Sequence, residues 1–257
     1  MSAGMPVWLA AGRGGTPLVM LHGMGSTASI WLPQLEYFAR ERLAVAWTMP
    51  GYGWSPAPSE LTWPALAKSL HDMLDALDIE QAHVLGHSIG GMIAQEFYHQ
   101  YPDRVKSLVL SATSAAFGSR DPAWKENFLN QRIDAMRPYA DFAEAAPELL
   151  AGFIKPDTSP RLRALASLSA SPIQKEAYLN AMRLLVTFDR SEEFSSISVP
   201  ILLLAGEHDT QAPPKGMQRL AQANANARFE QLPGLRHMAN IEAPHLFNQT
   251  VETFLTA

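Results

Sequence analysis

A serine flanked by glycines is the strongest chemical signal in the sequence. Residues 86–90 read Gly-His-Ser-Ile-Gly, a match to G-x-S-x-G, between a strand-like run at 82–85 and a helical run at 89–100. This context predicts a tight strand-to-helix turn that presents the Ser88 hydroxyl to a cleft. Gly86 and Gly90 are expected to leave out the side chains that would clash with such a turn. We therefore predict that Ser88 is a nucleophile for acyl transfer.

A serine hydroxyl needs a base that accepts its proton, and the chain offers eight histidines. His237 lies in a loop between the last predicted strand, at 228–232, and the last predicted helix, at 244–255. Loops at the carboxyl ends of strands carry the functional groups of open α/β sheets, so we predict that His237 is the base. We expect His22 to hold its own loop by hydrogen bonds and His87 to point away from the site.

The imidazole of a catalytic histidine is normally oriented by a buried carboxylate. Asp209 follows the apolar run at 199–205 and therefore lies at the carboxyl end of a predicted strand. Glu207 is its nearest rival, but Asp209 reaches further past the end of the strand. The chain order Ser88, Asp209, His237 is the order expected of one fold in particular.

An acyl-transfer site also needs two preorganised donors for the developing oxyanion. The backbone N–H of Ile89, directly after the nucleophile, is the first expected donor. The backbone N–H of Met24, in the loop His-Gly-Met-Gly after the first central strand, is the second. Because the main chain supplies both donors, the side chains of these two residues remain available to line a pocket.

Metal-binding patterns are weak. Glu207, His208 and Asp209 are adjacent in one loop, where three neighbours rarely converge on one zinc ion. His83 and His87 have the spacing of helical metal ligands, but they span a strand and a turn. We therefore expect no metal and no cofactor.

The elements that must position these residues alternate along the chain. Continuously apolar strands separated by helices predict an α/β fold with a mostly parallel sheet, covered by helices on both faces. A further strand is expected within the first fifteen residues. The other predicted strands cover 16–21, 43–48, 82–85, 105–111, 199–205 and 228–232, and the predicted helices cover 29–40, 62–78, 89–100, 217–223 and 244–255.

The alternation stops between about Ala116 and Asp189, where no strand-like run occurs. We predict an α/β core at 1–117 and 190–257, and a helical cap at 118–189 over the carboxyl ends of the strands. Apolar spacing predicts two helices in the cap, and several prolines punctuate it. The spacing is that of Trp124, Phe128, Ile133 and Met136, and of Ile173, Ala177, Ala181 and Leu185; the prolines are Pro138, Pro147, Pro156, Pro160 and Pro172.

The cap also contains arginines that an anionic substrate would use. An arginine that faces the cleft would indicate a substrate with a carboxylate, because the guanidinium binds carboxylates bidentately. Spacing alone favours none of the candidates, which are Arg132, Arg137, Arg161, Arg163 and Arg183.

Composition limits the classes of function. The 257 residues include 20 Lys and Arg against 25 Asp and Glu, a net charge of −5, and no basic cluster, so we expect neither nucleic acid nor a membrane as a partner. The absence of cysteine excludes disulfides, iron–sulfur clusters and a cysteine nucleophile. No apolar run approaches the ~20 residues of a membrane span, and no basic start marks a signal peptide. We expect a cytoplasmic monomer or homodimer.

These motifs together resemble the α/β-hydrolase fold superfamily, across nearly the whole chain outside the cap. Within it, the sequence is most similar to the 3-oxoadipate enol-lactonase type and related carboxylic-ester hydrolases. The family usually has an acidic residue at the position of Thr48, which braces a loop. The pieces that carry the resemblance are HGMG, MPGYGWS, GHSIGG, LLLAGEHD and LPGLRHMANIEAP.

The resemblance implies a serine hydrolase that cleaves a carboxylic ester or a lactone, with a small-molecule substrate and a Ser88–His237–Asp209 triad. Haloalkane dehalogenases and epoxide hydrolases have an aspartate where this chain has Ser88, which excludes them. Carbon–carbon bond hydrolases of ring-cleavage products typically have a tryptophan where this chain has Met238. Haloperoxidase-like esterases and N-acyl-homoserine lactonases stay open. A non-catalytic receptor for a small ligand is the alternative from another class, although a receptor has no need of a triad.

Overall fold

The computed structural model describes residues 4–118 and 120–257. One sheet has the strand order β1-β3-β2-β4-β5-β6-β7; β1 runs antiparallel to β3, and the other pairs are parallel. The predicted mostly parallel sheet is thus confirmed. Its strands are β1 (Trp8–Ala11), β2 (Leu18–Leu21), β3 (Ala44–Trp47), β4 (Ala82–His87), β5 (Val105–Ser111), β6 (Ile201–Gly206) and β7 (Ala227–Leu232).

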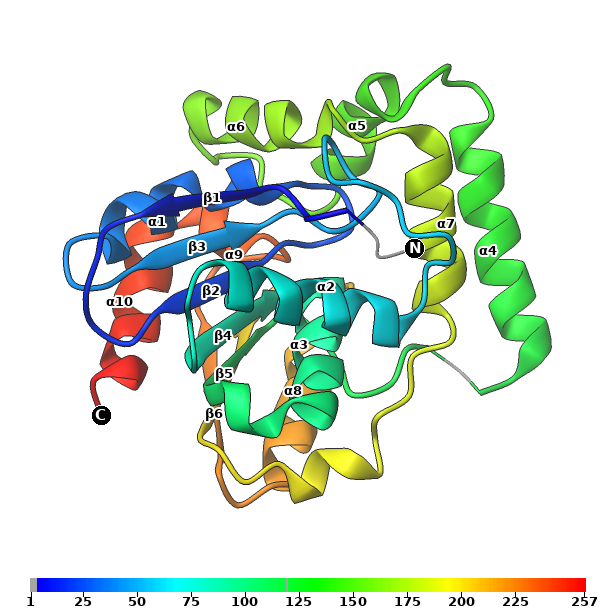
Figure 1. Cartoon of the computed structure of the whole chain (residues 1–257). Coiled ribbons are helices and arrows are strands. Elements are labelled where there is room, and N and C mark those ends of the chain that lie inside the picture. The colour runs from blue at the N-terminus through cyan, green and yellow to red at the C-terminus, as the bar shows by residue number, and fades with distance from the viewer. Residues whose placement is uncertain (1–3, 119) are drawn as a thin grey trace.

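Helices cover both faces of this sheet (Figure 1). On one face α1 and α10 pack against each other, and on the other α2 packs against α3 while α8 lies against β6 and β7. The central strands β2, β3, β4 and β6 are buried along their whole length, which explains their uninterrupted apolar sequences. These helices are α1 (Leu32–Phe38), α2 (Trp63–Ala76), α3 (Ile89–Gln100), α8 (Pro214–Gln222) and α10 (Pro244–Leu255), and the short α9 (Ala239–Glu242) precedes the last.

The chain changes direction across the sheet between β2 and β4. From β2 the chain passes to β3 on one side, and it returns to place β4 on the other side of β2. At such a point the loops that leave two neighbouring strands diverge, and a crevice opens at their carboxyl ends. The loop with Met24 follows β2 and the turn at Ser88 follows β4, so both face this crevice.

Among the described residues, four α-helices occupy the segment between Ala116 and Asp189, where the sequence predicted two. They are α4 (Pro122–Met136), α5 (Phe142–Ala151), α6 (Pro160–Ala170) and α7 (Lys175–Leu185). In Figure 1, α5 and α6 run along the top of the molecule, and α4 and α7 run down its right side. An isolated antiparallel bridge between Ala116 and Asp189 joins the two ends of the segment.

Prolines explain why the sequence did not predict α5 and α6. Pro160 occupies the first turn of α6, where a missing N–H costs nothing, and Ser159 caps this helix by accepting a hydrogen bond from the Leu162 amide (3.4 Å). Pro147 lies inside α5, which is capped at Asp141. The prolines therefore marked helix starts and a helix interior as well as loops.

Hydrogen bonds fasten this helical segment to the core. The amide of Thr27 donates to the Ser169 hydroxyl (2.9 Å), and the Thr27 hydroxyl donates to the Ser169 carbonyl (3.0 Å). On the other side, the Trp63 indole donates to the Thr187 hydroxyl (3.0 Å). These bonds fix α6 and the end of α7, whereas α4 packs mainly on α7.

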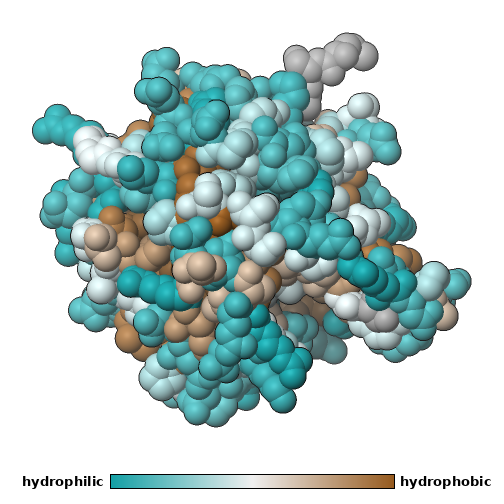
Figure 2. All heavy atoms as spheres, turned by 90° about the horizontal axis from the view of Figure 1, so that it is seen from below, coloured by the Kyte–Doolittle hydropathy of each residue, from teal (hydrophilic) through white to brown (hydrophobic). Residues whose placement is uncertain are grey.

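The surface is mainly polar where Figure 2 shows it. Hydrophilic side chains cover most of this face, and hydrophobic ones occur in smaller groups between them. Among the helices of the described residues, none is both long enough and apolar enough to cross a bilayer.

Candidate active site

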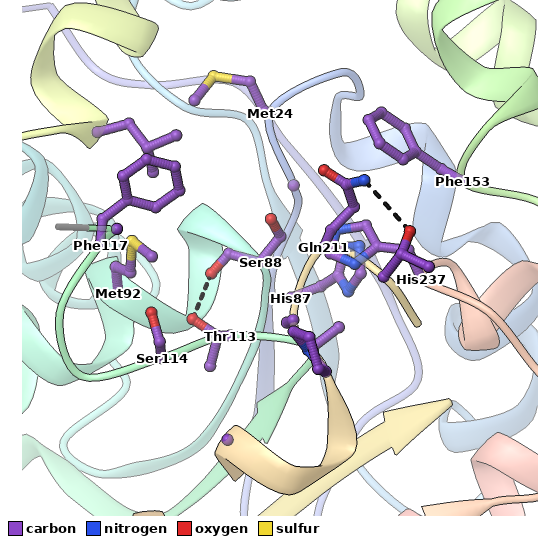
Figure 3. A pocket seen from close by; sticks show the side chains of 18 of the residues that line it. Met24, His87, Ser88, Met92, Thr113, Ser114, Phe117, Phe153, Gln211 and His237 are labelled. Atoms are coloured by element: carbon purple, nitrogen blue, oxygen red, sulfur yellow. Dashed lines mark hydrogen bonds between the residues drawn. The ribbon is translucent and has the colours of Figure 1, made fainter. Parts of the chain in front are cut away.

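Ser88 occupies a strained turn between β4 and α3. Its backbone has φ 55° and ψ −121°, a region that residues with a side chain rarely adopt. Neighbouring groups hold the turn: the Ser88 amide donates to the Ser111 carbonyl (2.9 Å), and the Ser88 carbonyl accepts from the Thr113 hydroxyl (2.7 Å) and the Gly91 amide (2.9 Å). Hydrogen bonds to the Ser88 amide and carbonyl thus hold the backbone in this strained conformation. The serine side chain faces the pocket (Figure 3).

The glycines on either side are required by close backbone contacts. A Cβ on Gly86 would lie 2.3 Å from the Gly90 carbonyl oxygen, and a Cβ on Gly90 would lie 2.3 Å from the carbonyl oxygen of Leu21 on β2. Both distances are far inside van der Waals contact. The helix therefore starts directly against the neighbouring strand, as the G-x-S-x-G pattern predicts.

His237 and Asp209 form a buried hydrogen-bonded pair. His237 Nδ1 lies 2.9 Å from Asp209 Oδ2, and Asp209 Oδ1 accepts from the amides of Gln211 (2.7 Å) and Ala212 (3.0 Å). Burial opposes ionisation of this carboxyl, but the hydrogen bonds from His237 and from these amides lower the pKa of Asp209. An ionised Asp209 accepts a hydrogen bond from the protonated Nδ1 of His237, which leaves Nε2 as the basic nitrogen.

Glu207 lies outside this pair. Its carboxylate is exposed and accepts a hydrogen bond from the Gly234 amide (2.8 Å), at the start of the loop that carries His237. Glu242 accepts from the Arg236 amide (2.9 Å) in the same loop. The two glutamates brace the loop, and of these three carboxylates Asp209 is the one hydrogen-bonded to the imidazole.

The loop with Met24 closely approaches the serine. A Cβ built on Gly23 would lie 2.8 Å from Cδ2 of His87 and 3.4 Å from Cβ of Ser88. Among the described residues none accepts a hydrogen bond from the backbone amides of Met24 and Ile89. The two expected oxyanion donors are thus unpaired amides beside Ser88.

His22 holds this loop, as predicted. Its Nδ1 lies 2.8 Å from the Gly23 carbonyl oxygen, and its Nε2 accepts from the Met49 amide (2.9 Å). Burial lowers the pKa of His22 to about 4, so the ring remains neutral in both roles. Thr48, which replaces the usual acidic residue, accepts from the Ala28 amide (3.1 Å) and still braces the neighbouring loop.

The prediction for His87 is wrong, because its ring lines the pocket. The centroids of His87 and His237 are 4.8 Å apart, and Figure 3 shows both side chains with Ser88 at the same cavity. The chain turns so sharply at Ser88 that the alternation of side chains along β4 does not extend to it. Burial, together with the neighbouring His237, lowers the pKa of His87 to about 3, and the ring is neutral.

A cavity of about 710 Å³ opens in front of Ser88 and His237. Its walls are mainly apolar and come from the core and from the helical segment alike. Phe153 is one of several apolar cap residues of which a few were expected to line a pocket, and its ring centroid is 5.5 Å from that of His237. The sequence did not single out Thr113, which binds the Ser88 carbonyl and reaches the site through long-range packing that leaves no local pattern.

Comparison with known proteins identifies the family. A family model described as alpha/beta hydrolase fold matches residues 16–244. The chain is 27% identical to a 3-oxoadipate enol-lactonase 2 of Acinetobacter baylyi, over 93% of this chain and 88% of that protein. It is 31% identical to a pimeloyl-[acyl-carrier protein] methyl ester esterase of Chromobacterium violaceum, over 87% of each.

A solved structure agrees with this result. The enol-lactonase of Burkholderia xenovorans superposes with a TM-score of 0.87 at 26% identity, over 98% of this chain and 96% of that one. The fold, the strained serine turn and the family model thus lead to the same assignment. The chain belongs to the alpha/beta hydrolase fold family.

Proposed function

We propose that this hydrolase cleaves a carboxylic ester or a lactone through an acyl-enzyme on Ser88. The observation that carries the proposal is the hydrogen bond of 2.9 Å between His237 Nδ1 and Asp209 Oδ2, in a pocket that Ser88 shares. A buried, ionised carboxylate on one ring nitrogen makes the other nitrogen a proton acceptor for the serine. Residues 118–189 act as a cap that completes the pocket.

The proposed reaction assigns a role to each of these residues. Ser88 Oγ attacks the carbonyl carbon while His237 Nε2 takes its proton, and the amides of Met24 and Ile89 bind the oxyanion. The tetrahedral intermediate collapses, and His237 returns the proton to the leaving alkoxide or enolate. Water then attacks the acyl-enzyme with His237 as the base, which releases the acid and restores Ser88. No step requires a metal or a cofactor.

The choice of an ester or lactone bond is supported by the relatives. The names of the two curated relatives describe an enol-lactonase and a methyl ester esterase, and both share about 30% of their residues with this chain. A small-molecule substrate fits the cavity of about 710 Å³.

Substrate panels test the bond class. We expect turnover of p-nitrophenyl butyrate or of a simple lactone, with a loss of about 10⁴-fold or more in kcat for Ser88→Ala and His237→Gln. His245→Gln, an exposed histidine at the start of α10, is the matched control and should retain full activity. Turnover of a vinylogous 1,5-diketone but of no ester would indicate a carbon–carbon bond hydrolase. Tight binding of small apolar ligands without any turnover would indicate a receptor.

A further inference from the structure

We propose that Arg132 and Tyr178 form a carboxylate-binding subsite in this cavity, so that the substrate is an ester or lactone with a free carboxylate. The inference rests on the proposed function, since it names the class of substrate for the same site. Arg132 comes from α4 and Tyr178 from α7, and both residues line the cavity that holds Ser88 and His237.

The guanidinium of Arg132 is held in place without an acidic partner. Its central carbon lies 4.9 Å from the centroid of the Phe128 ring, and Phe128 stacks on Trp124 at 5.4 Å with the two ring planes 14° apart. A cation over an aromatic face is stabilised and oriented. Within the described part of the chain, no carboxylate forms an ion pair with Arg132, whereas Arg137, directly after α4, pairs with Asp134 (3.2 Å).

Tyr178 supplies a neutral donor beside this cation. Burial raises the pKa of Tyr178 to about 12, against the opposing influence of the nearby Arg132 charge, so its hydroxyl stays protonated. No described residue accepts a hydrogen bond from this hydroxyl. The neighbouring Tyr52, by contrast, already donates to Sδ of Met24 (3.3 Å). Tyr178 is therefore free to donate to a ligand.

The charge of the cavity favours an anion. Among the described residues that line it, none is Asp or Glu, and the charged ones are Arg132 and Arg219. Arg219 is exposed on α8, where water screens its charge, whereas Arg132, on the cap helix α4, is half-buried. Because the other walls are mainly apolar, a neutral substrate would leave the Arg132 guanidinium without a counter-charge.

One guanidinium and one phenol match a carboxylate. The guanidinium offers two parallel N–H groups to the two carboxylate oxygens, and the phenol adds one O–H donor. A phosphate monoester dianion would retain excess charge against this single cation. Met24 links the subsite to the reacting carbonyl. Its amide is a proposed oxyanion donor, and its side chain accepts a hydrogen bond from Tyr52, which lies near Tyr178.

Matched esters test the subsite. For dicarboxylic acids of four to eight carbons, kcat/KM is measured for the monomethyl ester, which keeps a carboxylate, and for the dimethyl ester. We expect the wild-type protein to prefer the monomethyl ester by at least about tenfold, and Arg132→Met to reduce this ratio roughly 10- to 100-fold. Arg132→Lys should restore part of the ratio, and Tyr178→Phe should reduce it by a smaller factor. Arg137→Met, which removes an equal charge directly after the same helix, should leave the ratio unchanged.

Binding to a protein that cannot turn over separates the two proposals. On a Ser88→Ala background, calorimetric titration should show tighter binding of monomethyl adipate than of dimethyl adipate, with the difference lost in Arg132→Met. Equal binding of both esters, or an equal loss of both in Arg132→Met, would overturn the subsite even if the enzyme hydrolyses esters. Selective binding through Arg132 without any ester turnover in the wild type would retain the subsite and overturn the proposed reaction.

Discussion

At the scale of single residues, two carboxylates in one loop have opposite environments. Asp209 is buried, accepts three hydrogen bonds and contacts His237, whereas Glu207 is exposed and accepts one bond from the Gly234 amide. Both follow β6, and only position along the loop separates them. The difference between these two residues therefore tests the proposed orientation of the imidazole.

We expect Asp209→Asn to lower kcat for ester hydrolysis by about 10⁴-fold, because an amide that donates to Nδ1 stabilises the wrong tautomer of His237. Glu207→Gln keeps an acceptor for the Gly234 amide and should change kcat by less than about threefold. Steady-state kinetics of the two variants, with unfolding curves as a check of the fold, make the comparison. A larger loss of kcat for Glu207→Gln would show that Glu207, and not Asp209, orients the imidazole.

At the scale of elements, the turn between β4 and α3 depends on two backbone contacts that admit no side chain. Gly90 lies against the Leu21 carbonyl, so the start of α3 is fixed on β2. By contrast, Gly216 lies within α8, and a Cβ there would meet no atom within 4 Å. These two helical glycines form a matched pair.

We expect Gly90→Ala to lower the free energy of unfolding by at least about 2 kcal/mol, because the backbone of β2 must move away from the new methyl group. Gly216→Ala should raise it by about 0.5–1 kcal/mol, since alanine has the higher helix propensity. Urea denaturation of both variants measures these changes. Equal stability of Gly90→Ala and the wild type would show that the turn can relax and that its geometry is not enforced by packing.

The parts of this fold that lie next to each other in the sequence are the parts that the sequence predicts. The serine turn was predictable because its glycines, strand and helix are contiguous, and His237 and Asp209 because each follows a strand of the sheet. The helices α5 and α6 were missed because Pro147 and Pro160 are equally typical of loops. That His87 borders the cavity depends on the abrupt turn at Ser88, which the alternation of side chains along a strand does not describe.

Selection among the cap arginines required three-dimensional packing. Arg132 lies within α4, and Arg137 directly follows this helix. Only the structure shows that Arg132 covers Phe128 inside the cavity while Arg137 pairs with Asp134 on the surface.

At the scale of the whole molecule, buried histidines couple folding to pH. Burial lowers the pKa of His22 and His83 to about 4 and that of His87 to about 3. In the unfolded chain histidine titrates near 6.5. Their contribution to stability is therefore complete above pH 6.5 and is lost as the pH falls toward 4, because only the unfolded state takes up the protons.

We expect each of these histidines to contribute about 2 kcal/mol to the loss of unfolding free energy between pH 7 and pH 5. His83→Gln, remote from Ser88 at the opposite end of β4, should reduce that loss by about this amount. His245→Gln, the exposed control, should leave it unchanged. Urea denaturation at the two pH values gives the numbers, and identical losses in all three proteins would mean that His83 does not remain neutral in the fold.

Covalent labelling shows whether Ser88 is a nucleophile that His237 activates. A p-nitrophenyl alkylphosphonate transfers its phosphonyl group to an activated serine and leaves a stable adduct. Intact-mass spectrometry should show one adduct per chain, peptide mapping should place it on Ser88, and His237→Gln should slow labelling by about 10³-fold or more. A label on another residue would show that Ser88 is not the nucleophile. Labelling of Ser88 at the same rate in His237→Gln would show that His237 does not activate it.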